Sequence, residues 1–254
     1  FAQGGGRREK VVLATKAYNQ MGDWPNESKL SALHIKRACE ASLKRLKTDH
    51  IDLYQMHHID RDTPWEEIWQ AMEQLVQEGK VLYVGSSNFA GWNIAQANEI
   101  AKNRNFLGIV SEQSLYNLVV RDVEMEVIPA CLEYGVGLIP WSPVNRGVLA
   151  GALKKANVQR MKHEGTRLIK EGGLHQQLEQ YEAFCDELGA NPAAVALAWL
   201  LHQPVVTAPI TGPRTMEHVD ISLQALEIKF TDEQLAKLDE IWPGYKTSPE
   251  HYAW

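Results

Sequence analysis

One stretch of the chain, residues 51–89, limits the possible folds more than any other. Residues 51–57 and residues 81–85 are short apolar runs rich in strand-forming residues. Between them, Thr63-Pro64 followed by two glutamates is typical of a helix start, with Thr63 as the N-cap, and Gly79 is typical of a helix end. A strand, a helix and a strand within about 40 residues predict a βαβ unit with parallel strands.

The same alternation of strand and helix patterns runs along the whole chain. Strands are expected at residues 10–16, 51–57, 81–85, 108–113, 136–141 and 205–210, each followed by a helix, and no internal repeat appears. This alternation predicts an α/β protein with a parallel sheet, either doubly wound or closed as a (β/α)8 TIM barrel. No Gly-x-Gly-x-x-Gly motif follows a strand, which argues against the doubly wound alternative. The sequence starts abruptly at Phe1, so we expect one barrel domain, residues 1–254, whose first two βα units are absent from this sequence.

Composition argues against several other classes of protein. The net charge of -6 and the lack of a long basic run give no reason to expect a nucleic-acid partner. The longest apolar stretch, residues 193–201, is too short to cross a bilayer, and we expect no signal peptide. The three cysteines are scattered without metal-ligand spacing, which favours buried thiols in a reducing compartment and no metal site. We therefore expect a cytoplasmic protein that contacts neither nucleic acid nor membrane.

Polar and aromatic residues stand where the predicted strands end. The carboxyl ends of parallel strands meet on one face of a barrel, where active sites are built. Taken singly, a lysine here is usually a solvated charge, a histidine a structural polar group and a tryptophan a core residue. Their joint placement predicts a functional site at Lys16, His57, Ser87-Asn88, Gln113 and Trp141-Ser142.

Several sequence segments also match the motifs of a known family, in the family's order. They are IKRACEASLKRLKTDHIDLYQMH, EGKVLYVGSSNF, EQSLYN, PWSPVNRGVLAG and GPRT, and they span nearly the whole chain. On these motifs the chain resembles the aldo-keto reductases. Residues 152–174, expected to be a variable loop, resemble the branch that includes potassium-channel β-subunit-like and bacterial reductases.

The resemblance implies NADPH-dependent reduction of an aldehyde or ketone by a Tyr, Lys, Asp and His tetrad. Lys16 and His57 match the catalytic lysine and histidine, and His58 is expected to line the substrate pocket. The lysine ammonium lowers the tyrosine pKa from its usual value of about 10, so that the phenol can protonate the carbonyl oxygen. The catalytic Asp and Tyr lie upstream of the lysine strand in the family, and Tyr18 matches neither. The 254-residue chain alone is therefore expected to be inactive.

The resemblance also implies a set of cofactor contacts. Ser87, Asn88 and Gln113 match residues that bind the nicotinamide carboxamide, and Trp141 matches the aromatic that stacks on the ring. The pyrophosphate contacts match Ser142, Pro143, Val144, Arg146 and Gly147. Arg214 and Thr215 match the 2′-phosphate site, and Gly212 and His218 complete the expected set. Ile221 and Ser222 stand where the family usually has Glu and Asn near the adenine.

Two other hypotheses compete with a reductase that acts on a small carbonyl compound. The first is a non-catalytic, reductase-like regulatory subunit that keeps the cofactor and lacks turnover. The second is an unrelated α/β enzyme, for which the matched motifs would be a coincidence. The sequence does not name the carbonyl substrate, and it leaves open whether several copies of the chain associate.

Overall fold

The computed structural model describes residues 4–154 and 173–253, and its chain divides into two compact units. Unit 1 comprises residues 1–113 and 126–137, and unit 2 comprises residues 114–125 and 138–254. The expected single domain over residues 1–254 stays a prediction. Of the expected variable loop, residues 152–174, the segment 155–172 lies outside the described residues.

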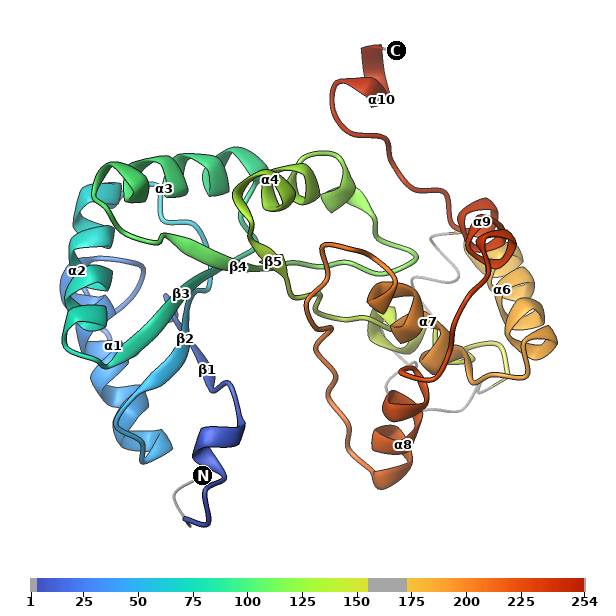
Figure 1. Ribbon diagram of the computed structural model, residues 1–254, viewed down its shortest axis with the longest axis horizontal. Coiled ribbons are helices and arrows are strands. Elements are labelled where there is room, and N and C mark those ends of the chain that lie inside the picture. Colours follow the sequence, from blue (N-terminus) through green and yellow to red (C-terminus); the bar gives the residue numbers. More distant parts are fainter. Residues whose placement is uncertain (1–3, 155–172, 254) are drawn as a thin grey trace. The chain divides into compact units, whose positions relative to one another are not determined.

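Unit 1 is built on parallel strands with helices along one face (Figure 1). β1 (Ala14–Ala17), β2 (Ile51–Met56), β3 (Val81–Ser87) and β4 (Ile109–Gln113) pair in parallel in this order, and β5 (Gly137–Leu138) follows β4 in the sheet. Within the described residues the sheet order runs from β1 to β5 without closing. The expected parallel α/β organisation is confirmed, and β2, α2 and β3 form the βαβ unit predicted for residues 51–89.

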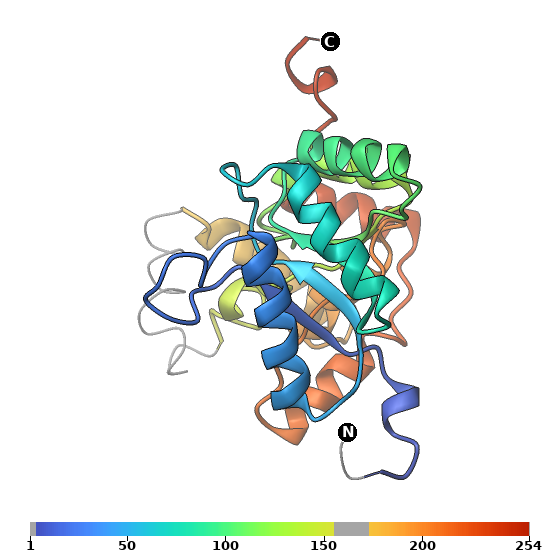
Figure 2. The ribbon, with the colours of Figure 1, turned by 90° about the vertical axis from the view of Figure 1, so that its left-hand side faces the viewer.

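The helices of unit 1 cover the outer face of these strands, as both views of the ribbon show (Figures 1 and 2). They are α1 (Ala32–Leu46), α2 (Trp65–Gln77), α3 (Gly91–Asn103) and α4 (Val127–Tyr134), and a short 3-10 helix, η1 (Arg8–Lys10), precedes β1. Trp69 of α2 is fully buried and its Nε1 donates a hydrogen bond of 3.1 Å to the carbonyl of Ala97 in α3. Burial of such large side chains fixes the helix layer against the sheet.

One expected helix start in unit 1 is wrong by one residue, that of α2. The N-cap of α1 is Ser31, whose hydroxyl accepts the amide of His34. The N-cap of α2 is Pro64 rather than Thr63, because the Thr63 hydroxyl donates to the Asp60 carboxylate at 2.7 Å instead. The expected end of α2 is confirmed, since Gly79 follows the helix with φ +69°.

Unit 2 is mainly helical. Its helices are α6 (His175–Glu187), α7 (Pro192–Leu201), α8 (Met216–Gln224), α9 (Asp232–Ile241) and α10 (Glu250–Ala253), with the 3-10 turns η2 (Asp122–Glu124) and η3 (Asn145–Gly147). Residues 194–200 of α7 are all buried, and α6 and α8 pack against this helix. Asn191 caps α7 and Pro192 takes its first position, and Thr231 and Gln234 form a capping box on α9.

The sixth expected strand, residues 205–210, is wrong: among the described residues its only ladder contact is an isolated bridge between Val206 and Leu138. The fifth, expected over residues 136–141, is also shorter than predicted. The two segments still run together, since Thr207 donates to Leu138 at 2.8 Å and Ile210 donates to Pro140 at 2.8 Å. Pro140 and Pro209 carry no amide hydrogen, so a regular ladder cannot form between them.

Arg121, whose side chain is 11% exposed, anchors the C-terminal segment of unit 2. Arg121 donates through Nε to Glu124 at 2.6 Å and through Nη1 to the carbonyl of Trp242 at 2.8 Å, and it lies over the Trp199 ring at 5.0 Å. Glu124 in turn accepts the amide of Tyr245 at 2.9 Å. This network fixes the chain where it leaves α9.

Candidate functional site

Unit 1 brings together the predicted residues at the ends of β1 to β4. In the sheet register Lys16 lies opposite Gln55, and Ser87 lies opposite Gln113. His57 directly follows β2, and its backbone amide donates a hydrogen bond of 2.9 Å to the carbonyl of Ala17 at the end of β1. The parallel register therefore places these side chains along one edge of the sheet.

The positive charge of Lys16 acts on the neighbouring His57. The pKa of His57 is lowered from its ordinary value, first by burial and then by the neighbouring His58 and the positive charge of Lys16. Burial also lowers the pKa of Lys16. The lowered pKa of His57 favours its neutral imidazole form. The Nδ1 atom of His57 is buried and has no hydrogen-bond partner within the described part of the chain.

His58 and Tyr18 extend this group of side chains. The rings of His57 and His58 stack with centroids 4.6 Å apart, and Tyr18 meets His58 edge-on at 5.2 Å. Tyr18 sits in the loop after β1 with φ +134°. This position makes Tyr18 a neighbour of the histidine that is expected to line the substrate pocket.

Ser87, Asn88 and Gln113 form a hydrogen-bonded cluster in unit 1. The Ser87 hydroxyl donates to the backbone carbonyl of Gln113 at 2.9 Å, and Asn88 Nδ2 donates to the Ser87 oxygen at 2.9 Å. Gln55, which is 2% exposed, donates through Nε2 to Gln113 Oε1 at 3.4 Å. Sequence reasoning missed Gln55, although a polar residue two positions before His57 must share its face of the strand.

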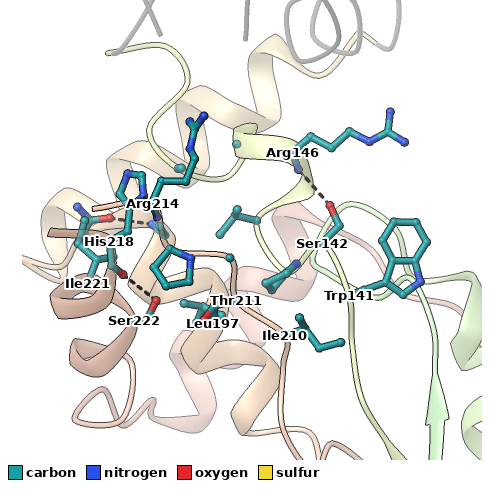
Figure 3. Close-up of a pocket in the computed structure, with 18 residues that line it drawn as sticks. Trp141, Ser142, Arg146, Leu197, Ile210, Thr211, Arg214, His218, Ile221 and Ser222 are labelled. Atoms are coloured by element: carbon teal, nitrogen blue, oxygen red, sulfur yellow. Dashed lines mark hydrogen bonds between the residues drawn. The ribbon is translucent and has the colours of Figure 1, made fainter. Parts of the chain in front are cut away.

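Unit 2 holds a cavity of about 510 Å³, and nearly all the other predicted residues line it (Figure 3). Its predicted lining residues are Trp141, Ser142, Pro143, Val144, Arg146, Gly147, Gly212, Arg214 and His218. Residues that were not predicted also line it, among them Asn191, Leu197, Ile210 and Thr211. Arg214 and His218 lie at one end of the cavity and Trp141 at the other, with Ser142 beside Trp141 and Arg146 above Ser142 (Figure 3).

The loop after β5 is folded by left-handed residues. Ser142, Asn145 and Arg146 have φ of +56°, +44° and +57°, and no feature of the sequence indicated this conformation. The loop is held in place because the amide of Arg146 bonds the Ser142 hydroxyl at 3.2 Å and the side chain of Asn117 donates to the Ser142 carbonyl at 3.0 Å. Backbone in this conformation turns amide groups toward a common centre, which suits an anion.

The other end of the cavity is the start of α8. Thr215 is the N-cap, its hydroxyl accepting the amide of His218 at 3.3 Å, and it does not line the cavity. His218 Nδ1 accepts the amide of Arg214 at 3.3 Å. Ile221 and Ser222 line the cavity, but the Ser222 hydroxyl donates to the His218 carbonyl at 2.8 Å. Among the described lining residues, Arg146 and Arg214 carry charge and none is a carboxylate.

Two kinds of feature are absent from residues 4–154 and 173–253. No helix there is long and apolar enough to cross a membrane. No group of three or more histidine, cysteine, aspartate or glutamate residues in these ranges could hold a metal ion.

Comparison with known proteins gives a consistent result. The model of the Aldo/keto reductase family matches residues 1–243. The chain is 51% identical to the uncharacterized oxidoreductase YrpG of Bacillus subtilis, an alignment that covers 100% of this chain and 79% of that protein. It is 34% identical to versiconal hemiacetal acetate reductase of Aspergillus parasiticus, covering 92% of this chain and 74% of the relative. It is 33% identical to a putative voltage-gated potassium channel subunit beta of Schizosaccharomyces pombe, covering 92% of this chain and 72% of that protein.

Proposed function

Because the chain belongs to the aldo/keto reductase family, a family of oxidoreductases, we propose that it binds NADPH and reduces an aldehyde or ketone to an alcohol. The observation that carries the choice of cofactor is the cavity of unit 2. It combines an aromatic side chain, a loop with left-handed backbone, and the guanidinium groups of Arg146 and Arg214, without a carboxylate among its described lining residues. This chemistry fits a ligand with an aromatic ring and several phosphates.

Each end of the cavity has a role in this proposal. Arg214 pairs with the 2′-phosphate of the adenosine, where a guanidinium fork suits a dianion. Thr215 acts there through the start of α8, because it caps the helix rather than lining the cavity. Ser142, Arg146 and Gly147 contact the pyrophosphate, and Trp141 stacks on the nicotinamide. Ile221 offers the adenine an apolar contact in place of a hydrogen bond.

The residues of unit 1 provide the chemistry in this proposal. When bound, the reduced nicotinamide supplies the hydride. Ser87, Asn88 and Gln113 would hold the carboxamide of the nicotinamide. His57, kept neutral by its lowered pKa, donates a hydrogen bond that orients the carbonyl oxygen. The Lys16 ammonium lowers the pKa of the phenol that protonates this oxygen.

The proton donor itself matches no position of these 254 residues, and neither does the aspartate of the tetrad. We therefore expect the 254-residue chain to bind NADPH without measurable turnover, since a positioned general acid contributes about 10²–10⁴-fold to the rate. The proposal also includes a cytoplasmic location, a small carbonyl compound as the substrate, and no nucleic-acid or membrane partner.

A fluorescence titration with NADPH, followed by an assay with a panel of aldehydes and ketones, tests the proposal. Saturable binding of NADPH supports it, and failure to bind any nicotinamide cofactor contradicts it. A polypeptide that also carries a matching upstream tyrosine and aspartate should turn over. Binding without turnover in that longer polypeptide would favour a cofactor-binding regulatory subunit, an alternative suggested by the relative named as a putative potassium channel subunit beta.

A further inference from the structure

A buried carboxylate joins the two loops that follow β1 and β2. Asp60 is 5% exposed. Its Oδ2 accepts the backbone amide of Leu30 at 3.0 Å and the hydroxyl of Thr63 at 2.7 Å, and its Oδ1 accepts the amide of Asp62 at 3.0 Å. A carboxylate that accepts three hydrogen bonds in a buried position is held firmly, and it holds its donors equally firmly.

The local turn explains only part of this arrangement. The bonds to Asp62 and Thr63 belong to the same loop, as in an ordinary turn before a helix. The bond to Leu30 instead crosses to the loop after β1, 30 residues away in sequence. The buried charge of Asp60 therefore fixes one loop against the other.

The two loops carry the side chains next to the expected reacting carbonyl. Leu30 follows Lys29, whose amide donates to the carbonyl of Tyr18 at 2.7 Å. Tyr18 meets the His58 ring edge-on at 5.2 Å, and His58 stacks on His57 at 4.6 Å. A continuous series of contacts therefore links Asp60 to the two histidines. It passes through Leu30 and Lys29 at the end of the first loop and through Tyr18 at its start.

We propose that Asp60 is a positioning residue that sets where His57 and His58 lie relative to Tyr18. The inference rests on the proposed function in so far as His57 is taken to orient the substrate carbonyl. Asp60 itself does not touch the reacting atoms: it acts through Leu30, Lys29 and Tyr18 on one side and through its own loop on the other.

The test compares three variants of the 254-residue chain by NMR titration of the histidine rings. Asp60→Asn keeps the size of the side chain but places an NH₂ group against amide and hydroxyl donors. Thr63→Val removes one donor and preserves the shape of the threonine. Asp62→Asn is the matched control, because Asp62 lies in the same loop and pairs with Lys29 of the other loop, but its side chain is 77% exposed.

Loss of the Asp60 contacts should expose the His57 ring and shift its resonances. Burial is the first cause of the lowered His57 pKa, ahead of His58 and Lys16, so this pKa should rise toward the ordinary value of 6.5 in Asp60→Asn. The shift should be smaller in Thr63→Val and absent in Asp62→Asn. His57 resonances and pKa that stay at wild-type values in a folded Asp60→Asn chain would overturn the proposal.

The Thr63→Val titration and the affinity for NADPH separate a failure of the Asp60 proposal from a failure of the proposed function. Should Asp60→Asn fail to fold, Thr63→Val decides, and an unchanged His57 titration in that variant overturns the proposal. The affinity for NADPH should be the same in all variants, because the proposed 2′-phosphate and pyrophosphate contacts lie elsewhere in the chain. A wild-type chain that does not bind NADPH while Asp60→Asn still shifts His57 would contradict the proposed function and leave the role of Asp60 supported.

Discussion

Ser87 and Gln113, at the carboxyl ends of neighbouring strands, are joined by a hydrogen bond of 2.9 Å from the Ser87 hydroxyl to the Gln113 backbone carbonyl. Asn88 reinforces this link, since its backbone amide donates to the same carbonyl at 3.0 Å and its side chain donates to the Ser87 oxygen at 2.9 Å. The residues proposed to hold the nicotinamide carboxamide are thus fixed by contacts within the protein.

The substitution Ser87→Ala should weaken the fold. It removes the donor to Gln113 and the acceptor for Asn88 at a position that is fully buried, so the free energy of unfolding should fall by about 1–3 kcal/mol. Urea denaturation measures this change. Ser222→Ala, which removes an exposed hydroxyl-to-helix bond, should stay within about 0.5 kcal/mol of wild type. Equal values for the two variants would contradict the role given to Ser87.

The substitution Arg121→Ala should release the C-terminal segment. It leaves the Glu124 carboxylate, whose side chain is 12% exposed, without its charge partner and breaks the bond to the Trp242 carbonyl, so we expect a loss of about 3–5 kcal/mol. Limited trypsin digestion should cut after Lys246 faster than in wild type. Lys237→Ala removes an exposed ion pair with Glu240 and serves as the control. Cleavage at the wild-type rate in Arg121→Ala would disprove the anchoring.

Stability should depend on pH through two histidines, His34, which is buried, and His57, which is partly buried. Burial is the first cause of the lowered pKa of both His34 and His57, so the unfolded chain, with an ordinary histidine pKa of 6.5, binds protons more readily than the folded chain. Their contribution is therefore complete above about pH 6.5 and is lost as the pH falls below it. The free energy of unfolding should decrease from pH 7 to pH 5.

Variants identify the source of this pH dependence. Replacing His34 and His57 by asparagine should flatten the pH profile between pH 7 and pH 5, whereas replacing the exposed His175 should leave its slope unchanged. Denaturation curves at several pH values provide the measurement. An unaltered slope in the double variant would show that other groups control stability in this range.

Much of unit 1 could be predicted from the sequence because its signals are local. Alternating apolar runs and helix ends place His57, Ser87 and Gln113 at strand ends, and parallel pairing then brings them together. The bond between Asp60 and Leu30 could not be predicted, because it depends on how two loops 30 residues apart meet. Gln55 was missed because it lies inside an apolar run that looked like core.

Unit 2 was predicted less well for a different reason. The segment 205–210 has the composition of a strand, but Pro140 and Pro209 withhold the amides that a ladder needs. The left-handed conformations of Ser142 and Arg146 have no sequence signal, since neither residue is glycine. Part of the cavity lining, including Trp141, Arg146 and Arg214, was nevertheless predicted, because the family motifs mark these residues independently of secondary structure.

The two adjacent histidines should have different effects on catalysis. In a polypeptide that turns over, His57→Ala should lower kcat by roughly 10²-fold, because it removes the proposed donor to the carbonyl oxygen. His58→Ala should act mainly on KM, since His58 contacts Tyr18 and is expected to line the substrate pocket. Steady-state kinetics with one aldehyde measure kcat and KM for both variants. A larger loss of kcat in His58→Ala would mean that the two roles are exchanged.

The central claim, an NADPH site at the start of α8, is tested most directly by comparing NADPH and NADH binding in Arg214→Ala. Losing the charge-assisted contact to the 2′-phosphate should weaken NADPH binding by about 1.5–3 kcal/mol and leave NADH binding unchanged. Arg146→Ala is the matched control, because a pyrophosphate contact should weaken both cofactors equally. Fluorescence titration should therefore show the preference for NADPH disappearing in Arg214→Ala and persisting in Arg146→Ala. A preference that survives in Arg214→Ala would contradict this account of the cavity.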